Sequence, residues 1–469
     1  MDRADSRCAH ERDTMNLVVI IADTVRFDYL GVNGGPVHTP NLDALARSSR
    51  FFTRTYAASF PTVPARADYL TGTYALARIG WGPRPRELVT VPQLISASGV
   101  TTVGVVDTPF YVANGYNYDK GFDYFYDLPT QDLEGQRHGD DRIPKRSVLV
   151  PEPRRTEYDY CAPRTMTVAE MCLEQLVDTR FLLWVDTWDP HEPWDPPAWY
   201  VKRYKSDYDG RVVEPVYGRY AAHGLTEEDF QTARACHWGE LTMVDRWIGR
   251  LLERLESLGI AERTAVLFTS DHGFYFGERG GQLGKMIRPD GSDQMHWIRS
   301  PLYPECTHVP LMLRVPGDAP RRDDRLVSAI DIAPTLLDFF GIRPEPHMPG
   351  ASVLREQDGR SFAITAMPLS EPGDEVALVD DVTRSVLEWQ PITVTTDEWM
   401  MLFSRWSDPI ELYDAVRDPW CTRNLADERP EVVEELHRLM ISELERAGAD
   451  SGAIAARREG GPVVADLRG

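Results

Sequence analysis

Short apolar runs alternate along the chain with longer amphipathic stretches. Five of these runs are continuous and rich in β-branched residues, as is typical of buried strands. They cover residues 17–22, 101–106, 181–185, 265–269 and 309–315. An amphipathic pattern over about residues 227–258, closed by Gly259, predicts a long helix. Strands that alternate with helices in this way predict an α/β fold, with a mostly parallel sheet sandwiched by helices.

From about residue 366 the pattern changes to strand-like pieces in close succession, which is typical of an antiparallel meander. These pieces cover residues 376–379, 391–395 and 399–404, and a final helix is predicted over residues 430–447. We therefore predict a smaller C-terminal antiparallel sheet with a helix. The predicted divisions are a disordered extension at residues 1–14, a large α/β domain at 15–365, an α+β subdomain at 366–448 and a flexible tail at 449–469.

Composition and charge limit the classes of partner. The chain of 469 residues has a formal net charge of −22, which argues against nucleic acid or an anionic membrane as the main partner. A small anion is still compatible, because a site can be locally positive. Six scattered cysteines without a CxxC pair indicate reduced thiols. The N-terminus resembles no signal peptide and no apolar run could span a bilayer, so we expect a cytoplasmic protein. The sequence indicates no oligomeric state.

Polar side chains follow three of the predicted strands. Asp23 follows the first, Asp189 and His191 follow the third, and Asp271 and His272 follow the fourth. The carboxyl ends of parallel strands lie at one edge of a sheet, where open α/β sheets bind their ligands. Single acidic residues after strands are common in turns, but carboxylates and imidazoles can also bind a metal or transfer protons. Three such endings together favour a chemical site.

A second candidate feature is the segment TVPARADYLTG at residues 62–72. Pro64 fits the first turn of a helix, so we expect Thr62 at the helix N-terminus, where free backbone N–H groups favour an anion. Arg66 follows four residues later, on the same helix face. A hydroxyl and a guanidinium so placed suit attack on a tetrahedral anion. On spacing alone, however, such a pattern more often belongs to a capped helix with a surface arginine than to an anion site.

This segment resembles the signature of the sulfatase family in the alkaline phosphatase superfamily, Cys/Ser-x-Pro-x-Arg followed by Leu-Thr-Gly. Other family blocks occur in the same order. They resemble the first metal-binding strand at residues 16–31, the next helix at 38–46, the DPHxP segment at 189–193, the second metal segment with its lysine at 268–285, and two later blocks at 331–341 and 411–425. The resemblance covers about residues 15–445 and implies the family's fold, with residues 15–365 as the catalytic domain.

For the metal site, the resemblance implies that Asp23, Asp271 and His272 bind a divalent cation. It also implies that the oxygen of Thr62 completes the site. Additional candidate ligands are Thr24, Asp189 and His308.

For the substrate, the resemblance implies that Arg66 and Lys285 hold the non-bridging oxygens of a small anionic ester. His191 is expected on the leaving-group side, as a general acid. His308 is a candidate at the rim of the site, or a structural histidine before a core strand.

Thr62 departs from the family signature. Sulfatases oxidise the cysteine or serine at this position to formylglycine, whereas the β-carbon of threonine carries a methyl group and oxidation would give only a ketone. No formylglycine can therefore form at Thr62. Ser59 does not restore the motif, because no arginine follows it at the required spacing. Threonine nucleophiles do occur in the phosphodiesterase and phosphonate hydrolase branches of the superfamily, where a phosphothreonine forms and water cleaves it.

Two further departures concern the metal. Thr24 stands where many sulfatases have a second aspartate, and His272 stands where calcium-type members have asparagine. Losing a carboxylate and gaining an imidazole favours manganese or zinc, with calcium, magnesium and iron still compatible. A two-metal site would need more ligands, which Asp189, His191 and His308 could supply. The dinuclear branch spaces its aspartate and histidine four residues apart, whereas Asp189 and His191 are two apart, so we favour one metal.

We therefore predict a metal-dependent hydrolase of a phosphodiester or phosphonate monoester, with Thr62 as nucleophile. One alternative is a sulfuric ester hydrolase that does not use formylglycine. Another is a non-catalytic relative that binds an anion or a partner, and a biosynthetic transferase is also compatible. The organic part of the substrate is not predicted, although irregular stretches at residues 126–165 and 274–305 are either specificity loops or solvated insertions.

Overall fold

The computed structural model describes most of the chain. The described ranges are residues 14–109, 111–112, 116–128, 156–285, 302–355, 359–369, 391–403 and 409–459. The predicted N-terminal extension, apart from Thr14, and the predicted strand at residues 376–379 lie outside them. The chain divides into two compact units. The first comprises Met1–Thr53, Pro92–Gly284 and Pro310–Asp323, and the second comprises Arg54–Val91, Lys285–Val309 and Asp324–Gly469.

The main sheet has eight strands in the order β11-β2-β10-β7-β1-β5-β3-β4. Its strands are β1 (Asn16–Ala22), β2 (Arg50–Tyr56), β3 (Thr101–Val106), β4 (Tyr124–Asp127), β5 (Phe181–Thr187), β7 (Thr264–Thr269), β10 (Leu311–Arg314) and β11 (Arg321–Ser328). β1 pairs in parallel with β5 and β7, and β3 pairs in parallel with β4 and β5. β10 is antiparallel to both β7 and β2. The predicted α/β fold with a mostly parallel sheet is confirmed.

Helices of the first unit cover the central strands. Every residue of β1 and β5 is buried, which explains the continuous apolar runs at residues 17–22 and 181–185. Helix α7 (Cys161–Leu176) packs against β5 and against α9 (Glu227–Ser257), which in turn packs against α2 (Pro40–Arg47). Helix α9 begins with a capping box, because Thr226 and Asp229 each accept a hydrogen bond from the other's backbone N–H. The long helix predicted here is therefore confirmed.

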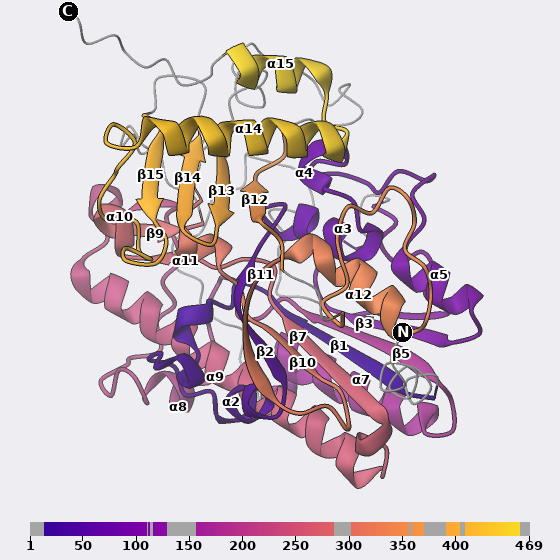
Figure 1. The fold of residues 1–469 in the computed structure, drawn as a ribbon. Helices are drawn as coiled ribbons and strands as arrows, with labels where there is room; N and C mark the ends of the chain where they lie inside the picture. Colours follow the sequence, from indigo (N-terminus) through magenta and orange to yellow (C-terminus); the bar gives the residue numbers. More distant parts are fainter. Residues whose placement is uncertain are drawn as a thin grey trace, which may run out of the picture. The chain divides into compact units, whose positions relative to one another are not determined.

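The second unit contains a four-stranded antiparallel sheet in the order β12-β13-β14-β15. Its strands are β12 (Phe362–Ala366), β13 (Ile392–Thr396), β14 (Trp399–Phe403) and β15 (Glu411–Asp414). Helix α14 (Pro430–Ala447) packs against β12 and β14 (Figure 1). The predicted smaller sheet with a helix is confirmed. A further helix, α15 (Ser451–Glu459), forms within the segment for which the sequence predicted a flexible tail.

Several elements gave no clear sequence pattern. Strands β2 and β11 carry charged residues and are only partly buried, so neither contains a continuous apolar run. A three-stranded sheet was also not predicted. Two of its strands lie in the stretch at residues 274–305 that was predicted to be irregular, and the third lies earlier in the chain. Its strands are β6 (Gly218–Arg219), β9 (Gln282–Gly284) and β8 (Tyr275–Phe276). Strands of two or three residues are too short to show a period of two.

The described part of the chain also shows the state of the cysteines and whether any helix could cross a membrane. Its five cysteines are buried and no disulfide joins them to one another, as predicted; they are Cys161, Cys172, Cys236, Cys306 and Cys421. None of the described helices combines the length and the apolar character that a membrane crossing requires.

Candidate active site

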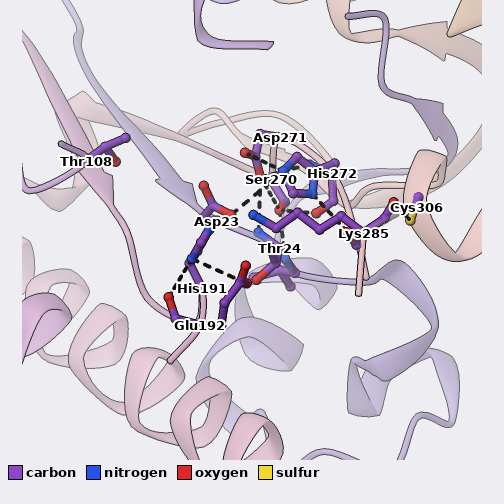
Figure 2. Close-up of polar contacts among 12 residues, drawn as sticks. Asp23, Thr24, Thr108, His191, Glu192, Ser270, Asp271, His272, Lys285 and Cys306 are labelled. Carbon is purple, nitrogen blue, oxygen red and sulfur yellow. Dashed lines mark hydrogen bonds and ion pairs between the residues drawn. The ribbon is translucent and has the colours of Figure 1, made fainter. Parts of the chain in front are cut away.

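Three predicted metal ligands, Asp23, Asp271 and His272, come together in the first unit (Figure 2). Asp23 follows β1, and Asp271 and His272 follow β7, which is the direct neighbour of β1 in the sheet. One candidate ligand atom from each residue lies within 4.8 Å of the other two, and all three residues are buried. We call these residues the metal group. Among the described residues, no other set of three or more histidines, cysteines and carboxylates meets the same geometric criterion.

The hydrogen bonds of the metal group fit a cation. Nδ1 of His272 lies 2.8 Å from the carbonyl oxygen of Gly273, which can only accept, so in the neutral ring Nδ1 carries the proton and Nε2 presents a lone pair. Nε2 lies 3.3 Å from Oδ2 of Asp271 and 4.0 Å from Oδ1 of Asp23. Two carboxylates and a lone-pair nitrogen that face one another in a buried site are a donor set for a divalent cation such as manganese or zinc.

Thr24 braces the metal group in a strained backbone conformation. Its φ angle is 56°, in the left-handed region that β-branched residues rarely adopt. Its backbone N–H donates to Oδ1 of Asp271 at 3.1 Å, and its hydroxyl donates to the carbonyl oxygen of Pro190 at 3.0 Å. Thr24 therefore connects the carboxylate of Asp271 to the turn that carries His191.

Asp189 and His191 lie in the turn after β5, but the metal group does not include them. Oδ2 of Asp189 accepts a hydrogen bond at 2.9 Å from the backbone N–H of Ala162, in the first turn of α7. A carboxylate at this place is stabilised by the helix dipole. His191 is buried, and its ring stacks on that of Trp188. Asp189 and His191 thus have partners outside the metal group, and one metal rather than two stays a prediction.

Sequence reasoning overlooked Asp107 as a site residue. It follows β3, which is the neighbour of β5, so the rule about strand ends could have found it. Its carboxylate accepts hydrogen bonds from the Thr165 hydroxyl at 2.7 Å and from the Trp188 backbone N–H at 2.5 Å. Burial, and then the neighbouring charge of Asp189, raise the pKa of Asp107 to about 8. Asp107 thus supports the turn that carries His191.

In the second unit, helix α3 (Thr62–Thr71) begins at Thr62, as predicted. Pro64 lies in its first turn, and Arg66 follows Thr62 by one turn. The alternative of a surface arginine is wrong, because the side chain of Arg66 is only 2% exposed. Thr62 is buried as well. The free backbone N–H groups of this helix start favour an anion, and a buried hydroxyl and guanidinium beside them are compatible with one.

A buried carboxylate anchors the start of α3. Oδ2 of Asp68 accepts from the backbone N–H of Ser59 at 2.7 Å, and Oδ1 accepts from the Ser59 hydroxyl and from the Ala75 N–H at 2.8 and 2.7 Å. Burial raises the pKa of Asp68 to about 7. Ser59 thus has a structural partner on α3, which agrees with the conclusion that it does not replace the signature residue.

The two remaining candidates, Lys285 and His308, also belong to the second unit. Lys285 is 2% exposed, and its carbonyl oxygen accepts a hydrogen bond from the Cys306 thiol at 3.6 Å. The His308 ring stacks on Tyr56, with ring centroids 5.0 Å apart, and the two residues form an isolated β-bridge. These contacts favour the structural interpretation of His308.

Comparisons with known proteins identify the family and the fold. The sulfatase family profile matches residues 15–342. The chain is 25% identical over 406 residues to iduronate 2-sulfatase of Mus musculus, which covers 72% of the chain and 70% of the relative. It is 26% identical over 508 residues to endo-4-O-sulfatase of Bacteroides thetaiotaomicron, with 93% of each protein covered. The crystal structure of a phosphonate monoester hydrolase of Agrobacterium radiobacter matches with a TM-score of 0.70 at 20% identity, covering 92% of this chain and 96% of that one.

Proposed function

The chain belongs to the sulfatase family and is a hydrolase of ester bonds, and from that premise we propose that it cleaves phosphodiesters or phosphonate monoesters with Thr62 as the nucleophile. The metal is assigned to Asp23, Asp271 and His272. Arg66 and Lys285 are assigned to the non-bridging oxygens of the ester, and no formylglycine takes part.

The observation that carries this proposal is the identity and position of Thr62. It is the first residue of α3, it is 1% exposed, and Arg66 lies one turn further along the helix. The backbone N–H groups of a helix N-terminus favour an anion. A threonine in this position keeps a hydroxyl nucleophile but cannot become an aldehyde. The proposed reaction therefore proceeds through an ordinary alkoxide.

The breakdown of the covalent intermediate favours phosphorus esters over sulfate esters as substrates. The Thr62 oxygen forms a bond to the central atom, its proton passes to solvent, and the bond to the leaving-group oxygen breaks with the electron pair on that oxygen. A phosphothreonine can then be cleaved by attack of water at phosphorus. A sulfated threonine lacks the hemiacetal collapse by which formylglycine releases sulfate, so turnover of sulfate esters would stall. A divalent cation in the metal group would lower the pKa of an oxygen nucleophile and offset the charge of the ester.

A second function has support from the sequence relatives. Iduronate 2-sulfatase and endo-4-O-sulfatase are named as sulfatases, which hydrolyse sulfuric esters. Each of them matches more than two thirds of the chain. A sulfuric ester hydrolase that uses Thr62 directly is therefore the competing proposal. Fast turnover of p-nitrophenyl sulfate with slow turnover of phosphorus esters would establish it.

The decisive experiment compares wild type, Thr62→Ala and Thr62→Ser on three substrates. These are bis(p-nitrophenyl) phosphate, p-nitrophenyl phenylphosphonate and p-nitrophenyl sulfate. We expect wild type to prefer the phosphorus esters, Thr62→Ala to lose about 10³-fold or more in kcat/KM, and Thr62→Ser to keep part of the activity. Acid quenching during turnover should trap a phosphorylated or phosphonylated peptide that contains Thr62. Full activity of Thr62→Ala on every substrate would exclude Thr62 as the nucleophile.

A further inference from the structure

The turn that carries His191 is held in place by side chains from outside it. The backbone N–H of Trp188 donates to Oδ1 of Asp107 at 2.5 Å, and Nε1 of Trp194 donates to the carbonyl oxygen of Pro190 at 2.9 Å. These bonds add to those of Thr24 and Asp189. Because they tie the turn to several separate segments of the first unit, the backbone of His191 has little freedom.

The imidazole ring of His191 is held as well. It stacks on the indole of Trp188 with ring centroids 3.6 Å apart and an interplanar angle of 26°. Its Nδ1 lies 2.7 Å from the carbonyl oxygen of Glu192. A carbonyl oxygen can only accept, so Nδ1 is the donor. The nitrogen that remains for proton exchange with a substrate is therefore Nε2.

The side chain of Glu192 adds a charge beside the same nitrogen. Its Oε2 lies 3.3 Å from Nδ1 of His191, and dashed lines join the two residues (Figure 2). Glu192 is 8% exposed, so solvent screens this attraction only weakly. A carboxylate near Nδ1 and an indole face against the ring both stabilise a positively charged imidazole. The environment of His191 thus suits a proton donor.

We infer that Glu192 is a positioning residue for proton donation by His191, with Trp188 fixing the plane of the ring. This inference rests on the proposed function. As the bond between phosphorus and the leaving-group oxygen breaks, the proton on Nε2 moves to that oxygen, which receives the electron pair of the bond. The ring becomes neutral and keeps its Nδ1 proton beside Glu192. Glu192 itself need not touch the substrate, because it acts on the opposite nitrogen of the imidazole.

The contacts of His191 with Glu192 and Trp188 also favour proton donation by this histidine over metal binding. An imidazole that binds a metal is neutral and offers a lone pair. The carboxylate of Glu192 and the ring of Trp188 favour the protonated ring, and the metal group of the described residues does not contain His191. A loss of bound metal on substitution of Glu192 would therefore contradict the inference.

Esters with different leaving groups test the role of Glu192. A proton donor matters for a poor leaving group such as phenolate and much less for p-nitrophenolate. The variants are Glu192→Gln, which removes the charge but keeps the backbone carbonyl, and Glu192→Asp as the conservative rescue. The control is Glu170→Gln, which changes another largely buried carboxylate of the first unit, one that pairs with Arg250. The substrates are phenyl and p-nitrophenyl phenylphosphonate, with phenyl and p-nitrophenyl sulfate as a parallel pair.

We expect Glu192→Gln to lower kcat for the phenyl ester about 10- to 100-fold and kcat for the p-nitrophenyl ester less than about 3-fold, with little change in KM. Glu192→Asp should recover part of the loss, and Glu170→Gln should match wild type. Equal losses on both leaving groups, or no loss, would overturn the inference. If wild type hydrolyses only the sulfates, the proposed preference for phosphorus fails, while the sulfate pair still tests Glu192.

A measurement without turnover gives an independent check. Long-range ¹H–¹⁵N spectra report which ring nitrogen of a histidine carries a proton, and the signals of His191 are identified by their loss in His191→Asn. We expect Nδ1 of His191 to be protonated at about pH 7. An unprotonated Nδ1 in wild type would overturn the inference even if no ester were cleaved.

Discussion

Nε2 of His272 lies 3.3 Å from Oδ2 of Asp271, and in the neutral ring that nitrogen bears a lone pair, because the proton is on Nδ1. Two electron-rich atoms this close repel each other in a buried site. A cation between them converts the repulsion into attraction. The geometry of these two residues is therefore the strongest structural support for a metal.

Metal removal tests this interpretation. Treatment with a chelator should abolish ester hydrolysis and lower the melting temperature, because a ligand that binds only the folded protein stabilises it. Manganese or zinc should restore both, and calcium should restore them less well. Asp23→Asn and His272→Ala should each lower kcat/KM by about 10³-fold or more, since a metal contributes several kcal/mol to catalysis. Atomic emission would measure the bound metal, and full metal content in both variants would contradict the assignment.

Substitutions of Thr24 test two effects, the strain of its backbone conformation and the hydrogen bond from its hydroxyl to Pro190. Thr24→Val keeps the branched shape but loses the hydroxyl that donates to Pro190, so stability should fall by about 1 kcal/mol and kcat should fall with it. Thr24→Ser should behave like wild type. Thr24→Gly relieves the strain of the φ angle of 56° but also loses the hydroxyl, so its stability should exceed that of Thr24→Val. Urea denaturation measures these differences, and equal stability of Thr24→Val and Thr24→Ser would exclude a bracing role for the hydroxyl.

Asp245 should make stability depend on pH. Its carboxylate accepts hydrogen bonds from the Leu42 N–H at 2.7 Å and the Asn41 side chain at 2.9 Å, at the start of α2. Burial raises the pKa of Asp245 to about 6. The folded protein therefore holds this proton up to about pH 6, whereas the unfolded chain releases it near pH 4, and stability must fall as pH rises between these values.

The size of that effect is on the order of 2 kcal/mol, and Asp245→Asn should remove it. Free energies of unfolding of wild type and variant at several pH values from about 4 to 7 give the difference directly. The control is Asp229→Asn, because the pKa of the Asp229 carboxyl is lowered by its hydrogen bonds to Thr226 and its effect falls below this range. If the stability difference between wild type and Asp245→Asn does not change with pH, folding does not shift the pKa of Asp245, which contradicts the prediction.

Arg360 joins two buried carboxylates in the second unit. Its guanidinium lies 3.1 Å from Asp331 and 3.6 Å from Glu443. Arg360→Met leaves both acids without this partner, and we expect a loss of about 3 to 5 kcal/mol in the free energy of unfolding. Arg355→Met is the matched control, because the Arg355 side chain pairs with Asp338 but is 62% exposed, and such pairs contribute about 0 to 1 kcal/mol. If the two variants lose similar amounts of free energy of unfolding, burial does not make the ion pairs of Arg360 more stabilising than an exposed pair.

The sequence by itself determined the elements whose patterns are local. The runs that became β1, β3, β5 and β7, and the periodic stretches that became α9 and α14, are long enough to bury a face without reference to distant residues. Asp23 and Asp271 could also be placed together from sequence, because parallel strands end at the same edge of a sheet. Thr62 could be assigned to a helix N-terminus by the position of Pro64 alone.

Tertiary structure decided which partner each polar group meets. The bond from Thr24 to Asp271 joins residues 247 positions apart, and the bond from Leu42 to Asp245 spans 203 positions. No local pattern encodes such pairs, because their geometry depends on how every intervening element packs. The stack of Trp188 on His191 involves near neighbours, but a turn allows many side-chain directions, and the contacts of the fold select one. Local periodicity thus placed Asp23 and Asp271 at one edge of the sheet, and long-range packing set the orientation and the hydrogen-bond partners of the polar groups.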